Sequence, residues 1–449
     1  MTRPTRRLVL VVRADPVICG HSGEARNLAE AALDRGFDDV RIISWPIDRL
    51  IESGLPLKPL DSISPYREGI TVERPGPVGN YKVLDGRYLA GLTGRLVELF
   101  TDGVPTVCMS LYLSPHAVAV DDALRAAQRS GLPVRVSTIA EAVGSDVTNL
   151  VRNCIESGRL GAAAHLLTTY LANDLCVAVS EYTRQTIVAE ATVLDSRHGT
   201  TFAEECRRRV EISYPAINAR QFTDLDPQDT AAALSARGLT PRGYALFLSR
   251  LSAAKGVEDL IDGYSRSAAS GRVTLVIAGN GPEAERLREL AAESPVADRI
   301  VFLDDVSDDE KPHLMAGSAA FVLPSKPVPE FIETFGIALV ESMLAGGGPV
   351  ITTTTGGIGE AVGATALLVD VEDPAGIAAA LDRAVLEMTD DERHAWAERV
   401  RGYALQFDRA RVFERLIART PAPDGMARAG GQSSASVISR PPITVAARL

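Results

Sequence analysis

Short runs of apolar, β-branched residues alternate with stretches of helical periodicity along most of this chain, and this alternation constrains the fold more than any other feature. Continuous apolar runs of this length are typical of strands buried on both faces of a parallel sheet. Their alternation with helical patterns predicts repeated βα units. The candidate strands are residues 8–12, 40–44, 106–110, 134–139, 177–180, 245–249, 274–278, 300–303, 320–323, 350–353 and 367–369.

The chain has 449 residues, more than one hydrophobic core usually serves, so the pattern predicts two successive domains. We expect an α/β fold in which two Rossmann-like, doubly wound parallel-sheet domains face each other across a cleft. The segment 52–83, rich in Pro, Gly and Asp, is expected to form a long surface insertion. The predicted boundaries are 1–218 for the first domain, 219–240 for an interdomain linker, 241–400 for the second domain, 401–419 for a C-terminal helix that crosses back to the first domain, and 420–449 for a disordered tail.

Composition and charge narrow the possible partners. Hydrophobic residues make up 46% of the chain, charged residues 23%, and no apolar run is long enough for a transmembrane segment, which predicts a soluble globular protein. The net charge of −11 disfavours nucleic acid and anionic membranes, because affinity for them comes mostly from a basic surface. The cysteines, Cys19, Cys108, Cys154, Cys176 and Cys206, are odd in number and widely spaced. They therefore predict neither disulfides nor a zinc site, and they fit a cytoplasmic location.

The most informative segment is the predicted strand 245–249, which is followed by Arg250 and then by Lys255 and Gly256. Two cations after the carboxyl end of a parallel strand, with glycine opening the next helix, can meet an anion at the topological switch point of the sheet. The alternative is an arginine and a lysine on a solvated loop, and for this segment alone that reading is the simpler one.

A second segment contains two glutamates, Glu333 and Glu341, that are eight residues apart. Along one helix this separation is about 12 Å, roughly the distance between the sugar and the ribose of a nucleotide sugar across its diphosphate. Phe335, Gly336 and Ile337 are then expected in the first helical turn, where unpaired N–H groups and the helix dipole favour phosphate. The alternative is an ordinary amphipathic helix whose glutamates face solvent.

The order of these segments resembles that of the retaining GT-B glycosyltransferases of family 4, the glycosyl transferases group 1. The residues that carry the resemblance are, in chain order, Arg250, Lys255-Gly256, Gly279-Asn280-Gly281-Pro282, Val301-Phe302-Leu303, Glu333, Phe335-Gly336, Glu341, Gly356-Gly357-Ile358 and Glu360. Upstream, 177–183 and 212–218 resemble that family's last N-domain strand and its linker, and the resemblance thins out before residue 105.

The resemblance implies roles for single residues of the second domain. Arg250 and Lys255 would neutralise the diphosphate and the charge that develops on it as the bond to the sugar breaks. Glu333 would hold hydroxyls of the donor sugar and help to stabilise an oxocarbenium-like centre. Glu341 would accept hydrogen bonds from the ribose hydroxyls.

The resemblance also places the base of the nucleotide, between the loop of Gly279 and Asn280 and the backbone near Val306. Asp304 and Asp305 stand where the family often has glycine, which leaves the choice between a UDP-linked and a GDP-linked donor open. The nucleotide sugar is a co-substrate, and no further cofactor is implied.

A D-x-D sequence, Asp224-Leu225-Asp226, could indicate the metal site of the other glycosyltransferase fold. It lies in the predicted linker, and Pro227 follows it, so it predicts a turn. No metal is therefore expected.

The acceptor is expected to bind the first domain. Gly20, His21 and Ser22 belong to a glycine-containing turn after the first strand, where they could meet donor phosphate or acceptor; a tight turn and a capped helix are an equal alternative. His116 follows another predicted strand, and similar folds often place a histidine near there to touch the transferred sugar. Glu141 also follows a strand and could grip a polar acceptor or cap a helix.

Together, the residues and the resemblance predict transfer of a sugar from a nucleotide-diphosphate donor to a small-molecule, polar acceptor, with retention of configuration. An overall likeness to glycosyltransferases of lincosamide or aminoglycoside pathways favours a role in antibiotic biosynthesis. The alternatives are a glycolipid or polysaccharide acceptor, a GT-B sugar-nucleotide epimerase, and a non-catalytic sugar-nucleotide-binding protein.

Overall fold

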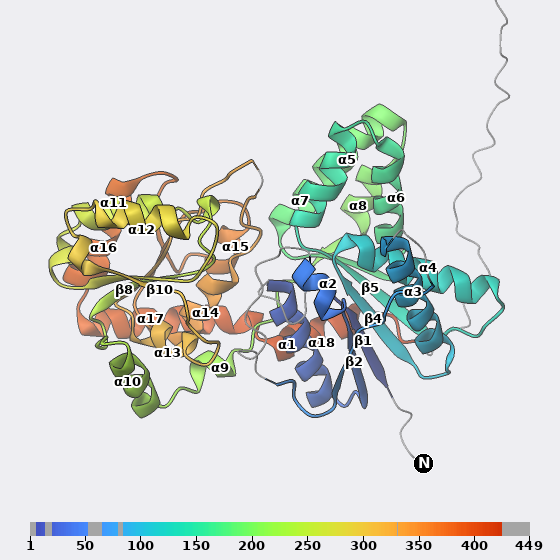
Figure 1. The fold of residues 1–449 in the computed structure, drawn as a ribbon, viewed down its shortest axis with the longest axis horizontal. Coiled ribbons are helices and arrows are strands. Elements are labelled where there is room, and N and C mark those ends of the chain that lie inside the picture. The colour runs from blue at the N-terminus through green and yellow to red at the C-terminus, as the bar shows by residue number, and fades with distance from the viewer. Residues whose placement is uncertain (1–5, 14–19, 53–64, 80–83, 330, 424–449) are drawn as a thin grey trace, which may run out of the picture.

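The computed structural model describes residues 6–13, 20–52, 65–79, 84–329 and 331–423, which form two α/β domains (Figure 1). The first domain contains a seven-stranded sheet in the order β3-β2-β1-β4-β5-β6-β7, and the second a six-stranded sheet in the order β10-β9-β8-β11-β12-β13. Neighbouring strands of both sheets are parallel. This confirms the predicted fold class of two doubly wound parallel-sheet domains.

The central strands are buried on both faces, as a parallel sheet between two helical layers requires. The strands of the first sheet are β1 (Arg7–Val11), β2 (Asp39–Ile43), β3 (Ile70–Glu73), β4 (Thr106–Leu111), β5 (Val136–Ala142), β6 (Leu175–Ala178) and β7 (Val210–Ile212). Those of the second are β8 (Tyr244–Leu248), β9 (Thr274–Ala278), β10 (Ile300–Leu303), β11 (Ala320–Leu323), β12 (Val350–Thr352) and β13 (Leu367–Leu368).

Helices cover both faces of each sheet (Figure 1). In the first domain they are α1 (Gly20–Asp34), α2 (Ile47–Glu52), α3 (Leu84–Thr101), α4 (Val118–Arg129), α5 (Asn153–Glu156), α6 (Leu160–Leu171), α7 (Glu181–His198) and α8 (Phe202–Arg209). The helices after the first domain's last strand are α9 (Arg220–Thr223), α10 (Pro227–Ala236), α11 (Val257–Arg266), α12 (Ala284–Ala292), α13 (Lys311–Gly317), α14 (Ile337–Ala345), α15 (Ile358–Val362), α16 (Pro374–Asp382), α17 (Asp390–Ala404) and α18 (Arg409–Arg419).

Two strands at the edges of the first sheet were not predicted. β3 lies inside the segment interpreted as a surface insertion, and its residues are only partly buried, so it lacks the continuous apolar run that marks the inner strands. β7 has three residues, of which Val210 alone is buried, and it rather than β6 is the last strand of the first domain. The predicted strands at 274–278, 300–303 and 320–323 coincide with β9, β10 and β11.

The segment predicted as a linker, 219–240, is mostly helical and packs on the second domain. Phe222 of α9 and Leu234 of α10 belong to the buried core of that domain. The carboxylate of Asp226 accepts a hydrogen bond from the backbone N–H of Gln228 at 2.6 Å and so caps α10, which explains the D-x-D sequence as a helix start. The polar composition of the segment reflects the solvent-facing sides of short helices.

The last helix, α18, returns to the first domain and lies beside α1 (Figure 1). Val412, Phe413 and Leu416 are buried in the core of the first domain, and the rings of Phe37 and Phe413 meet edge to face, with centroids 5.5 Å apart. An ion pair between Arg409 and Glu30 adds to this contact. The predicted disordered tail lies outside the described residues from residue 424 onward.

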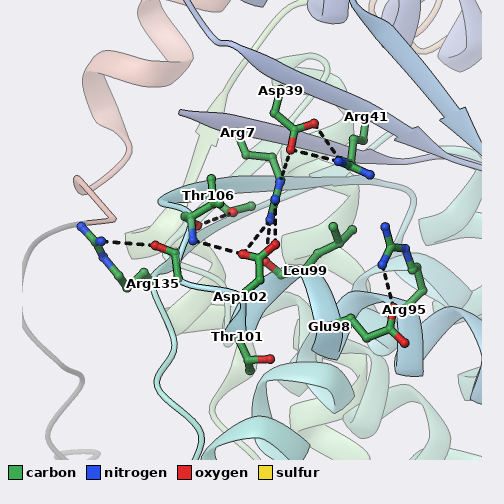
Figure 2. Close-up of polar contacts among 12 residues, drawn as sticks. Arg7, Asp39, Arg41, Arg95, Glu98, Leu99, Thr101, Asp102, Thr106 and Arg135 are labelled. Carbon is green, nitrogen blue, oxygen red and sulfur yellow. Dashed lines mark hydrogen bonds and ion pairs between the residues drawn. The ribbon is translucent and has the colours of Figure 1, made fainter. Parts of the chain in front are cut away.

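A buried arginine ties together the amino-terminal edge of the first sheet (Figure 2). Arg7, which is 4% exposed, donates to the carboxylates of Asp39 and Asp102 at 2.6 and 2.7 Å and to the carbonyl of Leu99 at 2.8 Å. The guanidinium therefore joins β1 to β2 and to the end of α3. Because each donor has an acceptor, the charge can stay buried in this position.

We expect Arg7→Met to destabilise the first domain by roughly 2–4 kcal/mol, because it leaves Asp102 without its ion-pair partner and Asp39 with Arg41 alone. Urea unfolding monitored by circular dichroism measures the loss. The matched control is Arg35→Met, whose ion pair with Glu414 is 36% and 56% exposed, and we expect it to cost at most about 1 kcal/mol. Equal losses for the two variants would contradict the importance of burial here.

Glu73, on β3, supplies a dependence of stability on pH. Burial opposes its ionisation, but hydrogen bonds from Arg95 and Arg41 outweigh burial and lower the pKa of Glu73. A lowered pKa in the folded state gives stability that is present above the unfolded pKa of about 4.3 and is lost as the pH falls through the folded pKa.

We therefore expect Glu73→Gln to be less stable than the parent chain at about pH 7, and the difference to shrink below about pH 4. Urea midpoints measured along a pH series test this. Glu52→Gln serves as the control, since its carboxylate is 61% exposed. A difference that stays constant down to low pH would mean that charge pairing is not the source of the effect.

Candidate active site

The cations predicted from the sequence lie after the carboxyl end of β8, next to the topological switch point between β8 and β11. The turn of Arg250 packs against the loop after β9, where the N–H of Leu251 donates to the carbonyl of Asn280 at 2.9 Å. Gly279 has a φ of 133°, and a Cβ at that position would lie 2.0 Å from the carbonyl oxygen of Ser249. Gly279 and Asn280 thus brace the loop that carries Arg250.

Lys255 and Glu333 form an ion pair between their Nζ and Oε2 atoms, and both side chains are 12% exposed. The ammonium group also lies 5.3 Å from the ring centroid of Phe331. Lys255 ends a short 3-10 turn, and Gly256 follows it with a φ of 66°, so close to the backbone of Pro324 that a Cβ would lie 2.1 Å from its carbonyl oxygen. A glycine is therefore required directly after the lysine.

Lys326, in the loop after β11, also contacts this turn. Its backbone N–H donates to the carbonyl of Ala254 at 2.9 Å, and its Nζ pairs with Glu258 at 2.6 Å and Asp259 at 3.0 Å in the first turn of α11. The loop after β11 is in this way tied to the residues on both sides of Lys255.

Arg250 differs from Lys255 in its surroundings. It is exposed and makes no ion pair or hydrogen bond with a side chain among the residues that the structure describes. An arginine that is charged at every physiological pH and not matched by a carboxylate is available to an anionic ligand.

Glu333 and Glu341 do not lie on one helix, contrary to the prediction. Gly336 adopts a φ of 100° and is the N-cap residue, so α14 begins at Ile337 and Glu333 lies in the preceding loop. The separation derived from helical rise therefore does not apply. Glu341, within α14, pairs with Lys311 of α13 at 2.7 Å.

Phe335 also precedes the helix instead of forming its first turn. Its side chain is 2% exposed and packs against Tyr214 and Phe407, with ring centroids 5.5 and 5.1 Å away. These two rings belong to the chain segments that cross between the domains. The aromatic residue of the motif thus has a packing role, and the backbone of Gly336 and Ile337 remains at the helix N-terminus.

Thr334, which lies between Glu333 and Phe335, touches the first domain. A Cβ on Gly144 would lie 2.1 Å from the Cγ2 atom of Thr334, so the turn after β5 fits against the loop of the second domain only with glycine at this position. We call this contact, together with that of Ser180 and Gly357 beside it, the interdomain seam. The seam places the end of β5 directly against the loop that carries Glu333.

Glu360 holds the seam together. Its carboxylate accepts hydrogen bonds from the backbone N–H groups of Glu181 at 2.8 Å and Tyr182 at 3.2 Å, in the first turn of α7. A carboxylate at a helix N-terminus is stabilised by the helix dipole as well as by the hydrogen bonds. Glu360 was recognised as part of a motif, but its role across the domains was not predicted.

The first-domain candidates are buried. Ser22 in α1 is 8% exposed, His116 is 1% exposed and Glu141 is 0% exposed. Gly20 and His21 begin α1, and their side chains lie outside the described residues. His116 therefore lies within the domain, beside the ring of Tyr112 at 6.2 Å, and not on an open surface.

Tyr112 marks strain at the end of β4. Its φ of 134° is rare for a residue with a side chain and costs of the order of 1–3 kcal/mol. Asp146 joins the loops after β4 and β5, since it accepts from the N–H groups of Leu113 at 3.1 Å and of Val143 and Gly144 at 3.1 and 3.0 Å. Of these two strands, β4 lies beside β1 at the switch point of the first sheet, and β5 is the next strand after β4.

Ion pairs also surround the predicted base-binding segment. Arg237 pairs with Asp305 at 2.8 Å and Glu310 at 2.6 Å, and Val306 is half-buried against the core of the second domain.

Lys311, the partner of Glu341, was not predicted from the sequence as a site residue. A lysine at the start of a helix is a weak signal, although lysine is rare in this chain.

Residues 237–403 match the family model described as Glycosyl transferases group 1. The matched segment spans most of the second domain and includes Arg250, Lys255, Glu333 and Glu341. It covers well under half of the chain, so it identifies a domain of this kind and does not extend to the first domain.

Curated relatives are similar over parts of their length. The D-inositol 3-phosphate glycosyltransferase of Acidothermus cellulolyticus is 34% identical over 193 residues, 39% of this chain and 40% of the relative. The 2-deoxystreptamine N-acetyl-D-glucosaminyltransferase of Streptomyces fradiae is 35% identical over 155 residues, 33% of this chain and 34% of the relative. The chain spans less than half of the length of these curated relatives.

Solved structures match almost the whole chain. Anabaena Alr3699/HepE in complex with UDP and glucose has a TM-score of 0.64 at 19% identity and covers 92% of this chain and 98% of that one. WaaG, a glycosyltransferase involved in lipopolysaccharide biosynthesis, has a TM-score of 0.59 at 16% identity over 91% of this chain and 98% of that one. The two domains therefore have the GT-B fold of glycosyltransferases.

No group of three or more His, Cys, Asp and Glu side chains in the described part of the chain is arranged to hold a metal ion. Among the same residues, no helix combines the length and apolarity needed to cross a membrane.

We expect Glu360→Ala to loosen the seam, because it removes charge-assisted hydrogen bonds worth roughly 1.5–3 kcal/mol each when formed to an ionised group. Small-angle X-ray scattering should show a larger radius of gyration. Glu181→Ala is the matched control: it removes a carboxylate at the same helix end but leaves the N–H that Glu360 binds. Identical scattering from Glu360→Ala and the parent chain would show that the contact does not hold the domains together.

Proposed function

We propose that this protein is a glycosyltransferase that moves a sugar from a nucleotide-diphosphate donor to a small polar acceptor with retention of anomeric configuration. The observation that carries the proposal is the Lys255–Glu333 pair beside the unmatched Arg250, in a domain that matches the group 1 family model. This places two cations and a carboxylate at the end of a parallel sheet where ligands of such folds bind.

The two cations suit a leaving diphosphate. Arg250 offers a planar set of donors that fits phosphate oxygens, and Lys255 adds a compact charge on a braced turn. The N-terminus of α14 at Gly336 and Ile337 adds backbone N–H groups with the favourable end of the helix dipole. Negative charge that grows on the diphosphate as the glycosidic bond breaks is stabilised by all three.

The proposed role of Glu333 follows from its ion pair with Lys255. When a diphosphate binds, its oxygens compete with the Glu333 carboxylate for Lys255, and the carboxylate becomes available to hydroxyls of the donor sugar. Glu341, held by Lys311, is placed in α14 to accept from the ribose hydroxyls. The exchange of partners at Lys255 couples donor binding to the orientation of Glu333.

The identity of the donor and acceptor is supported by names of similar proteins. HepE has been solved with UDP-glucose, and a similar mannosyltransferase of Mycobacterium tuberculosis is named as GDP-mannose-dependent, so we propose a UDP-linked or GDP-linked donor. A relative named for 2-deoxystreptamine supports a small acceptor, and one named for kanosaminyl transfer is named for an amino sugar as the transferred group. On this basis we propose a role in antibiotic biosynthesis. The mannosyltransferase named for a phosphatidylinositol monomannoside favours a glycolipid acceptor as the second candidate.

We expect the double variant Arg250→Ala/Lys255→Ala to bind UDP or GDP about 100-fold more weakly, since two charge-assisted contacts to phosphate are lost. Glu333→Gln should bind the same nucleotide as well as the parent chain or better, because Lys255 no longer has an anionic competitor, while sugar transfer falls about 100-fold. Calorimetry measures the affinities, and proton NMR of the product measures the rate and the anomeric configuration.

The control for charge alone is Arg242→Ala/Arg266→Ala, which removes two arginines of the same domain that are 55% and 56% exposed. It should leave nucleotide affinity unchanged. Retained affinity in the Arg250→Ala/Lys255→Ala variant would refute the proposed donor site, and an inverted product would refute retention while leaving transfer intact.

A further inference from the structure

One buried acid in the first domain has only other acids for neighbours. Glu141 is the sixth residue of β5 and is 0% exposed, yet no N–H group of the described residues donates to its carboxylate oxygens, and the side chain that it contacts is the carboxyl of Glu24, another acid. Its neighbours Ala140 and Ala142 pack into the cluster formed by α6 and α7, so the Glu141 side chain lies on the opposite face of the sheet, toward α1. A carboxyl group buried in this way costs several kcal/mol unless a hydrogen bond or a charge compensates it.

The groups that face Glu141 make its ionisation harder. They are the carboxyls of Glu24 on α1 and of Asp146 in the loop after β5, and burial together with these two neighbours raises the pKa of Glu141 well above its usual range. Burial, with a smaller contribution from Glu141, raises the pKa of Tyr170 of α6. No cation among the described residues lowers the pKa of Glu141.

The neighbouring acids have structural roles that account for them. Asp146 accepts four backbone N–H groups, from Leu113, Val143, Gly144 and Val147. Glu24 accepts the N–H of Ala216 at 3.1 Å in the segment that leads to the second domain. Glu141 makes no such contact, so local folding does not explain why a carboxyl group is present there.

The location of Glu141 is close to the proposed chemistry. It lies three residues before Gly144, whose backbone meets Thr334 at the interdomain seam, and Thr334 directly follows Glu333. The carboxyl therefore sits at the carboxyl edge of the first sheet, on the side of the molecule that faces the donor loop. Metal binding does not account for it, since the described residues contain no group of acids arranged as metal ligands.

We propose that Glu141 recognises the acceptor and that the acceptor carries an amino group, as an aminated cyclitol or amino sugar does. This inference rests on the proposed glycosyltransferase function. An ammonium group provides both the hydrogen-bond donors and the positive charge that the surroundings of Glu141 lack. The net charge of −11 favours the approach of such a cation over that of an anionic acceptor.

Binding then involves one proton. The raised pKa of Glu141 favours its protonated form before the acceptor arrives, the ammonium group stabilises the ionised form, and the carboxyl proton passes to solvent. No bond to carbon forms or breaks in this step. An acceptor without an amino group cannot cause this release, because a neutral hydroxyl does not compensate a buried carboxylate between two other acids.

The test compares two cyclitols of similar size, 2-deoxystreptamine and myo-inositol, by calorimetry in the presence of UDP or GDP. We expect the parent chain to bind 2-deoxystreptamine at least about 10-fold more tightly than myo-inositol, and Glu141→Gln to abolish this preference without changing nucleotide affinity. Repeating the titration in buffers of different ionisation enthalpy should show release of about one proton by the parent chain and none by Glu141→Gln.

Asp122→Asn is the control, because it removes one exposed carboxylate from the same domain. It should behave as the parent chain does, and thermal melting should show both variants folded. Unchanged binding of 2-deoxystreptamine by Glu141→Gln, no preference between the cyclitols, or binding of neither would overturn the inference. If a nucleotide still binds in those cases, the donor site stands; if no nucleotide binds, the proposed function fails as well.

Discussion

The loop that carries Glu333 is the constraint on which the rest of the site depends, because successive residues of it have partners in different parts of the molecule. Glu333 pairs with Lys255 inside the second domain, Thr334 meets Gly144 of the first domain, and Phe335 packs among the aromatic rings of the crossing segments. The position of the proposed sugar-binding carboxylate is therefore set by both domains at once. A shift of the seam changes the site without any change in the residues that bind the donor.

Buried and half-buried charges follow one rule through most of the chain, namely that each has a partner. The described lysines, Lys255, Lys311 and Lys326, all pair with carboxylates in the second domain, and Arg7 does so in the first. Pairing allows these groups to remain charged away from water. Glu141 departs from the rule, and that departure is the reason to assign it to a ligand rather than to the fold.

Much of the architecture could be predicted, because inner parallel strands carry a local signal. β9, β10 and β11 are short apolar runs between polar segments, and their ends are visible in the sequence. The edge strands β3 and β7 were missed, since a strand that is covered on fewer sides needs fewer apolar residues. The helices of the predicted linker were not foreseen, because α10 shows its polar face in the sequence, whereas the packing of Leu234 depends on a core formed by distant segments.

The sequence by itself determined the fold class and the residues that can bind an anion, because strand periodicity, glycine positions and the spacing of Arg250, Lys255, Glu333 and Glu341 are local properties. Only the tertiary structure decided which of these charges face one another. It began the helix at Ile337, paired Lys255 with Glu333, placed Glu360 across the seam and buried Glu141 without an N–H donor. Those facts depend on contacts between residues far apart in the chain, and burial and pairing in three dimensions are what set the energy of a charge.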